Sequence, residues 1–297
     1  MKVLITSGFL GAGKTTFIKH IAKNINMEFV VLENEYADVG IDKDFLDEAN
    51  LNIWEMSEGC ICCSMTGDFK NSIKKIYEQI EPEYLLIEPT GIGMLSSIIK
   101  NIQSIKDCKI KLLNPITMLD ISCFDEYFEN FKDYFIDNIK NTGKILLTKL
   151  ENFGIDYIEN IKKKILKINP NADIVSDDYR LLSNEFLSNI FNTDIQKIKI
   201  ESNFKISNHV NLKTFSCKNI NLTDMDKLGL FLHKIISGDF GKVYRAKGFV
   251  KIQGQWGKFN IVHKNFEMEA CSSVTESKII VIGNNLDTKN IENYLKN

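Results

Sequence analysis

The chain has 297 residues, a length that predicts about two domains and a sizeable hydrophobic core. Hydrophobic residues make up 44% and charged residues 26%, a balance that is typical of globular proteins and excludes a wholly disordered chain. The 37 Lys and Arg residues nearly balance the 39 Asp and Glu residues, so the net charge of −2 provides no basic field for nucleic acid or an anionic membrane.

Neither the early apolar residues nor the cysteines indicate export or membrane insertion. The uncharged run Val3–Gly13 is far shorter than the roughly 20 residues of a membrane span, and it lacks the pattern of a signal peptide. The seven cysteines are an odd number, and three of them crowd into Cys60–Cys63, unlike the paired framework of an extracellular protein. We therefore expect a cytoplasmic protein without a membrane or nucleic-acid partner.

The first two thirds of the chain alternate short apolar runs with amphipathic segments. This pattern predicts strands at Lys2–Thr6, Phe29–Leu32, Ile53–Met56, Tyr84–Ile87, Leu112–Leu119 and Ile145–Leu147, and helices at Thr15–Asn24, Asp68–Glu81 and Glu151–Ile168. Buried strands that alternate with helices favour a mostly parallel sheet flanked by helices. We assign this α/β domain to residues 1–200.

After about residue 200 the pattern changes to that of a small α+β domain, which we assign to residues 208–297. Strands are expected at Asn211–Ser216, Gly248–Gln253, Lys258–His263 and Lys278–Ile282, and helices at Asp224–Ile236 and Lys289–Leu295.

A phosphate-binding loop joins the first strand to the first helix. Residues 8–15, Gly-Phe-Leu-Gly-Ala-Gly-Lys-Thr, match G-x-x-x-x-G-K-[ST] in the required strand–helix context, whereas the alternative is an ordinary glycine turn. Backbone N–H groups converge on the β-phosphate, Lys14 supplies charge to the β- and γ-phosphates, and the Thr15 hydroxyl binds Mg²⁺. Nucleotide contacts are therefore expected from Gly8, Gly11, Ala12, Gly13, Lys14, Thr15 and Thr16.

An acidic residue, Glu88, directly follows one of the predicted buried strands. Tyr84–Ile87 ends in Glu88, the arrangement of a Walker B carboxylate that positions Mg²⁺ or water, and the alternative is a surface acid at a strand end. Glu88-Pro89-Thr90-Gly91 resembles the acid-x-x-Gly turn of GTPases, in which the glycine N–H senses the γ-phosphate. We expect Lys14 and Glu88 to act in catalysis and Gly91 to bind nucleotide.

Residues 148–151 resemble the guanine-selecting [N/T]-K-x-D motif. Thr148-Lys149-Leu150-Glu151 follows a predicted strand, and an acid at its last position accepts from guanine N1–H and the exocyclic amine. The Lys149 stem would pack along the base. Glu151 in place of Asp lengthens the arm by one methylene, so we expect a modest preference for GTP over ATP; the alternative is an ordinary acid at a helix N-terminus.

Three clustered thiols indicate a metal site. Cys60, Cys62 and Cys63 offer soft thiolates that suit Zn²⁺ or a similar divalent ion, whereas the alternative is a set of buried core thiols. The remaining cysteines are scattered and are interpreted as packing residues: Cys108, Cys123, Cys217 and Cys271.

Together these motifs resemble the CobW-type GTPase metallochaperones. The resemblance rests on the phosphate loop, Glu33-Asn34-Glu35-Tyr36, Cys-x-Cys-Cys, Glu-x-x-Gly, Thr148–Glu151 and Tyr244–Phe249, which is similar to the Arg-x-Lys-Gly start of the family's C-terminal domain. It implies that Glu33, Asp38 and the three thiols bind metal near the nucleotide. This chain has Ala37-Asp38 where the family usually has Gly-Glu, and its four histidines are scattered and form no histidine-rich insert.

The resemblance implies a GTPase that hydrolyses GTP to GDP and phosphate and delivers zinc or cobalt to a client metalloprotein or cofactor-assembly enzyme. No catalytic Gln or arginine finger stands out in the sequence, so we expect slow turnover and a site completed by a partner or a nucleotide-dependent homodimer. Two alternatives are a nucleotide-bound metal sensor or buffer without turnover, and a P-loop small-molecule kinase.

Overall fold

The computed structural model describes residues 1–33, 52–55, 66–91, 93–106, 108–195, 212–262, 265–271 and 274–296, with only the backbone described for 52–55 and 66–68. All described residues before 196 belong to one compact unit, and all described residues from 212 belong to a second. Within these ranges, we find no helix with the length and apolar character of a membrane span.

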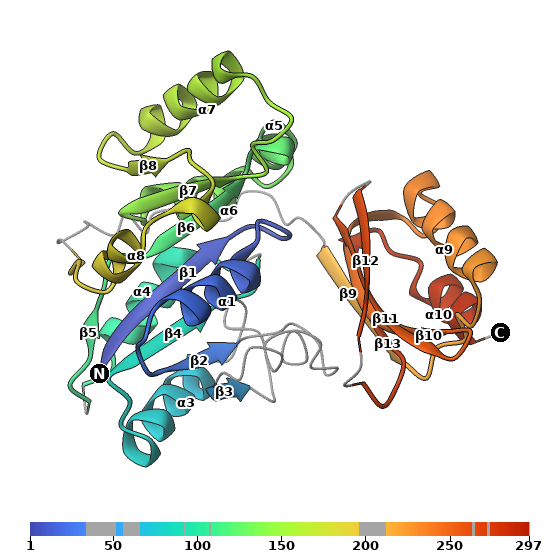
Figure 1. Cartoon of the computed structure of the whole chain (residues 1–297), viewed down its shortest axis with the longest axis horizontal. Helices are drawn as coiled ribbons and strands as arrows, with labels where there is room; N and C mark the ends of the chain where they lie inside the picture. Colours follow the sequence, from blue (N-terminus) through green and yellow to red (C-terminus); the bar gives the residue numbers. More distant parts are fainter. Residues whose placement is uncertain are drawn as a thin grey trace. The chain divides into compact units, whose positions relative to one another are not determined.

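The first unit is built on a parallel sheet with the strand order β3-β2-β4-β1-β6-β7-β8, and β5 also pairs with β1 (Figure 1). The strands are β1 (Lys2–Gly8), β2 (Phe29–Glu33), β3 (Asn52–Glu55), β4 (Tyr84–Glu88), β5 (Lys111–Leu112), β6 (Ile116–Asp120), β7 (Lys144–Thr148) and β8 (Asp173–Val175). This topology confirms the predicted α/β class. It also places the carboxyl ends of β4, β1, β6 and β7 along one edge, where the phosphate loop begins.

Helices cover both faces of this sheet because side chains of each strand point alternately to either side. Leu4 of β1 joins a core that includes side chains of α1 and α8, whereas Val3 and Ile5 join a second core with side chains of α3 and α4. The α-helices in the described residues of this unit are α1 (Lys14–Asn24), α3 (Thr66–Gln79), α4 (Leu95–Gln103), α5 (Phe124–Asn130), α6 (Lys132–Lys140), α7 (Ile155–Ile168) and α8 (Asn184–Ile190).

Two of the predicted elements of this unit are wrong in their extent. The predicted strand Leu112–Leu119 is two strands, β5 and β6, separated at Pro115, which has no N–H group to donate to a sheet. The predicted helix Glu151–Ile168 begins only at Ile155, after a turn in which the Phe153 N–H donates to the Leu150 carbonyl. Glu151 therefore lies in the loop after β7.

The second unit contains a five-stranded antiparallel sheet in the order β12-β11-β10-β13-β9. Its elements are β9 (Leu212–Lys218), α9 (Met225–Ser237), β10 (Lys242–Ile252), β11 (Gln255–Val262), β12 (Asn265–Ala270), β13 (Lys278–Asn284) and α10 (Thr288–Lys296). Both helices pack on one core with the sheet, which agrees with the predicted α+β class. Tyr244–Phe249 lies inside β10, after β9 and α9, and not at the start of this unit.

Candidate nucleotide and metal site

The phosphate loop turns tightly out of β1 and into α1. Gly8 has a φ of 140°, and a side chain at this position would place its Cβ 2.4 Å from the Met118 carbonyl oxygen of the neighbouring strand. Gly13, with a φ of 95°, directly precedes α1 in the left-handed conformation that glycine adopts most readily. The two predicted glycines are therefore required by the backbone as well as by the ligand.

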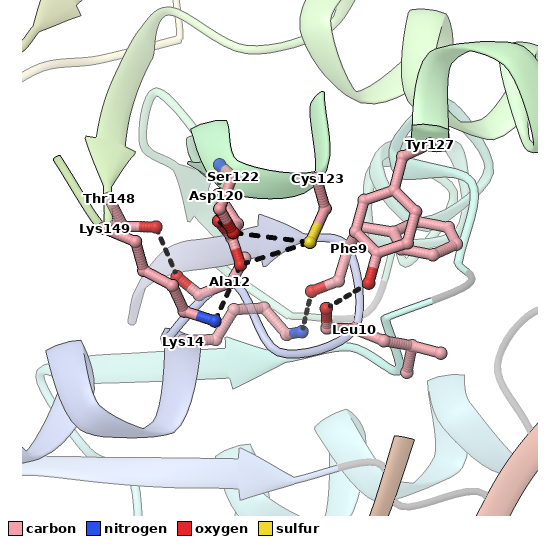
Figure 2. A network of polar contacts seen from close by, with 10 residues as sticks. All are labelled: Phe9, Leu10, Ala12, Lys14, Asp120, Ser122, Cys123, Tyr127, Thr148 and Lys149. Carbon is pink, nitrogen blue, oxygen red and sulfur yellow. Dashed lines mark hydrogen bonds and ion pairs between the residues drawn. The ribbon is translucent and has the colours of Figure 1, made fainter. Parts of the chain in front are cut away.

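The loop's own Lys14 and side chains from two other places in the unit bind the carbonyl groups of this loop (Figure 2). Lys14 Nζ donates to the carbonyls of Gly8 (3.0 Å) and Phe9 (3.3 Å). Tyr127 Oη donates to the Leu10 carbonyl and Thr148 Oγ1 to the Ala12 carbonyl, each at 3.1 Å. Within the loop the Ala12 N–H donates to the Phe9 carbonyl at 3.2 Å, so these contacts hold the backbone whose other N–H groups would bind an anion.

Tyr127 is a site residue that the sequence analysis missed. Its ring centroid lies 4.2 Å from that of Phe9, and the Phe131 ring packs on Phe9 from the same segment at 4.6 Å. The i, i+4 spacing of Tyr127 and Phe131 signals one helical face. It does not reveal that this face meets the phosphate loop.

The acidic end of β4 lies beside the first turn of α1. The Thr15 Oγ1 hydroxyl donates to Glu88 Oε1 at 2.9 Å, and Glu88 is buried. Two ligands at right angles around Mg²⁺, each at about 2.1 Å, are separated by about 3 Å, and Mg²⁺ prefers oxygen ligands. The two oxygens therefore fit a magnesium site in both chemistry and spacing.

A second buried carboxylate adjoins Glu88. Glu33 ends β2 and pairs with Glu88 across the parallel ladder, while Glu55 of β3 is its backbone partner on the other side. Glu33, which is buried, therefore lies at the same edge of the sheet as Glu88. The other predicted metal ligands lie outside the described residues: Asp38, Cys60, Cys62 and Cys63. In the part of the chain that is described, no group of three potential ligands occurs.

The loop after β4 is held against the phosphate loop. A Cβ at Gly91 would lie 2.6 Å from the Leu10 backbone nitrogen, so only glycine allows this approach. Asn138 of α6 donates from Nδ2 to the Gly93 carbonyl at 3.2 Å, and its Oδ1 accepts a hydrogen bond from Ser7 of β1. Asn138 could not be identified from the sequence, because an asparagine in an amphipathic helix has no motif of its own.

The guanine-type motif follows β7, and an acid from β6 fixes its lysine. Lys149 Nζ lies 2.7 Å from Oδ2 of the buried Asp120, whose Oδ1 accepts from the Ser122 N–H. Lys149 has a φ of 59°, a strained conformation for a residue with a side chain, and the ion pair helps to hold it. Asp120 was missed, although an acid at the end of a buried strand is the same signal that identified Glu88.

Two further residues lie near the guanine-type motif: Glu151, its last position, and Cys123, close to Asp120. Glu151 Oε1 lies 3.1 Å from Arg180 Nη2, in the loop after β8. Burial, reinforced by the charge of Asp120, raises the pKa of the Cys123 thiol to about 11. Cys123 is therefore a neutral thiol near neutral pH, which agrees with its interpretation as a packing residue.

Comparison with known proteins identifies the family of this chain. Residues 2–176 match the model of the CobW/HypB/UreG nucleotide-binding domain, and residues 212–297 match that of the cobalamin synthesis protein CobW C-terminal domain. The chain belongs to the CobW/HypB/UreG family. The predicted membership of a CobW-type P-loop GTPase family is thereby confirmed.

Individual relatives have low sequence identity to this chain but align with most of its length. The zinc-regulated GTPase metalloprotein activator 1 of Dictyostelium discoideum is 26% identical over 84% of this chain. The aligned part of this chain spans 62% of that protein, which is less than two thirds of its length. The zinc chaperone YjiA of Escherichia coli is 24% identical over 85% of this chain and 82% of its own. The crystal structure of Zn(II)-bound YjiA GTPase aligns over 99% of this chain and 97% of its own, with 20% identity and a TM-score of 0.49.

Proposed function

We propose that this protein is a zinc-regulated GTPase that hydrolyses GTP to GDP and phosphate and couples this reaction to delivery of a divalent metal to a client protein. The observation that carries the proposal is the arrangement of Thr15, Glu88 and Glu33 along one edge of the sheet. Glu33 begins the segment that leads toward Asp38, so a metal site there would adjoin the phosphate site.

The described residues include several of the parts that phosphoryl transfer needs. The N–H groups of the phosphate loop and the Lys14 ammonium would bind and orient the β- and γ-phosphates, and Thr15 and Glu88, which are hydrogen-bonded to each other, would hold the magnesium ion. When bound, Mg²⁺ neutralises charge that develops between the two phosphates. Gly91 lies against Leu10, and its N–H would sense the γ-phosphate. Thr148, Lys149 and Glu151 would hold the guanine base.

Metal would act as cargo, bound by Cys60, Cys62 and Cys63 with Glu33 or Asp38 as oxygen ligands. The names of the relatives favour zinc over cobalt as the native metal. The client would be a metalloprotein or a cofactor-assembly enzyme in the cytoplasm, and a nucleotide-dependent homodimer would complete the catalytic site. Membership of this family argues against a small-molecule kinase.

Multiple-turnover release of phosphate from Mg²⁺–GTP tests the proposal. We expect slow turnover that Zn²⁺ changes in wild-type protein but not in Cys62→Ser, and no turnover in Lys14→Ala. Lys162→Ala, which removes a lysine paired with Glu159 on α7, is the matched control for loss of a lysine. GTP binding without release of more than one equivalent of phosphate would instead indicate a nucleotide-bound metal sensor.

A further inference from the structure

An arginine beyond the residues matched by the nucleotide-binding model contacts the guanine-type motif. Arg180 Nη2 lies 3.1 Å from Glu151 Oε1, and this family model ends at residue 176. The two residues are 29 positions apart, and they meet because β7 and β8 are parallel neighbours whose following loops leave the same edge of the sheet. Arg180 thus lies beside the carboxylate that would select the base.

A second acid, Asp178, also binds the Arg180 guanidinium and holds it in place beside Glu151. Asp178 accepts from Arg180 Nε at 2.8 Å and from Nη2 at 2.6 Å, a fork that defines the plane of the guanidinium. Asp178 also accepts from the Arg180 backbone N–H, which closes the turn that carries both residues. The hydrogen bond from Arg180 holds the pKa of Asp178 below its ordinary value, so Asp178 is ionised near neutral pH.

The turn itself is anchored to the phosphate-binding helix. Tyr179, between Asp178 and Arg180, is buried, and its ring meets the edge of Phe17 at a centroid distance of 5.3 Å. Phe17 belongs to α1, the helix that begins with Lys14. Arg180 therefore projects from a turn whose neighbouring residue is packed into the core, and it offers Glu151 a fixed partner.

We propose that Arg180 is a specificity-determining positioning residue that orients Glu151 for guanine. This inference rests on the proposed role of Glu151 in GTP recognition. Glu has one more rotatable bond than Asp, so a Glu at this position loses more side-chain freedom when it is held in place. The ion pair removes part of that freedom before the nucleotide arrives.

The carboxylate can serve both partners at once. An ionised carboxylate has about four lone-pair sites, and the contact with Arg180 occupies one of them. The remaining sites can accept from guanine N1–H and its exocyclic amine, whereas adenine presents an acceptor at N1 and is repelled. Arg180 should therefore act on the preference for guanine and not on the affinity for phosphate.

The expected effect is small, because both side chains are more than half exposed, at 55% and 63%. Exposed ion pairs are screened by water, so loss of one changes an equilibrium constant by at most about two- to fivefold. We expect Arg180→Met to raise the Kd for GDP about two- to fivefold and to leave the Kd for ADP unchanged. Lys162→Met, which removes an exposed ion pair with Glu159 on α7, is the matched control and should change neither.

A double-mutant cycle in the full chain tests whether Arg180 acts through Glu151. In the Glu151→Ala background, Arg180→Met should have no further effect on the Kd for GDP. An equal loss of GDP and ADP affinity in Arg180→Met, an effect that persists without Glu151, or no change in the GDP-to-ADP ratio would each overturn the inference.

Glu151→Gln separates this inference from the proposed function. A carboxamide can donate to the C2 carbonyl of xanthine, so this variant should shift preference from GDP toward xanthosine diphosphate. If it does so while Arg180→Met remains inert, Arg180 has no positioning role and the GTPase proposal stands. If Glu151→Gln keeps its preference for GDP, the base is selected elsewhere and the inference fails, whereas the GTPase proposal fails only if wild-type protein releases no phosphate.

Discussion

The phosphate end and the base end of the candidate site are built in different ways. At the phosphate end, Lys14 and Glu88 are buried, at 5% and 6% exposure. At the base end, Glu151 and Arg180 are more than half exposed. Loss of a partner from a desolvated group costs far more than loss of an exposed ion pair. The comparison teaches that affinity should come from the phosphate end and discrimination between bases from the base end.

The largest effect is expected from Lys14→Ala. This change removes the buried ammonium that binds the Gly8 and Phe9 carbonyls and would neutralise the phosphates. Because a hydrogen bond to a charged group contributes about 1.5–3 kcal/mol, GDP affinity should fall about 100-fold. Equilibrium dialysis measures it, with Lys162→Ala as the control. Unchanged affinity would refute the assignment of the phosphate loop and remove the contrast between the two ends.

A smaller loss is expected from Tyr127→Phe, which keeps the ring against Phe9 but removes the hydrogen bond to the Leu10 carbonyl. A net hydrogen bond contributes about 1 kcal/mol, so GDP and ADP affinity should both fall about fivefold. Tyr294→Phe in the second unit removes an equivalent phenol–carbonyl bond, to Lys227, and should leave nucleotide binding unchanged. Selective loss of GDP binding in Tyr127→Phe would place Tyr127 at the base end instead.

The smallest effect concerns pH and Asp137, which lies next to Asn138 on α6. Burial raises the pKa of Asp137 above its ordinary value of 3.8, and the hydrogen bond from Ser96 opposes this only in part. A raised pKa in the folded state means that stability is fully present below the ordinary pKa and is lost as the pH rises through the folded value.

Asp137→Asn removes this titration. Relative to wild type, its free energy of unfolding should therefore increase as the pH rises above 3.8 through the raised pKa of the folded state. Urea unfolding at several pH values measures the difference. If the free energy of unfolding varied with pH in the same way for both proteins, burial of the Asp137 carboxyl would not destabilise the folded protein.

The sequence predicted the phosphate end better than the connections that hold it. Gly8–Thr15 and Glu88 are recognisable because their chemistry demands fixed residue types at fixed spacing. Tyr127 and Asn138 bind backbone carbonyls, a role that many polar residues can fill and that depends on which helices meet in the folded unit. Their positions follow from tertiary packing alone.

The fold, like the site, was predicted correctly in its central part and less well in its surrounding elements. Continuous apolar runs such as Tyr84–Ile87 identify buried parallel strands, so the class and the central strands were correct. The strands β8 and β12 were missed because they are short or exposed, with little apolar pattern. The break at Pro115 was readable in principle, since proline interrupts a strand, but the apolar residues on both sides concealed it.

The central claim is that metal and nucleotide share one coupled site, and linkage provides its most direct test. Zn²⁺ and Co²⁺ affinity should be measured by chelator competition in the nucleotide-free, GDP-bound and non-hydrolysable GTP-bound states, for wild type and Cys62→Ser. We predict wild-type affinities that differ between states by a factor equivalent to about 1–3 kcal/mol, and a weak affinity in Cys62→Ser that is the same in all three. Identical wild-type affinities in the three states, or unchanged metal binding in Cys62→Ser, would contradict the account.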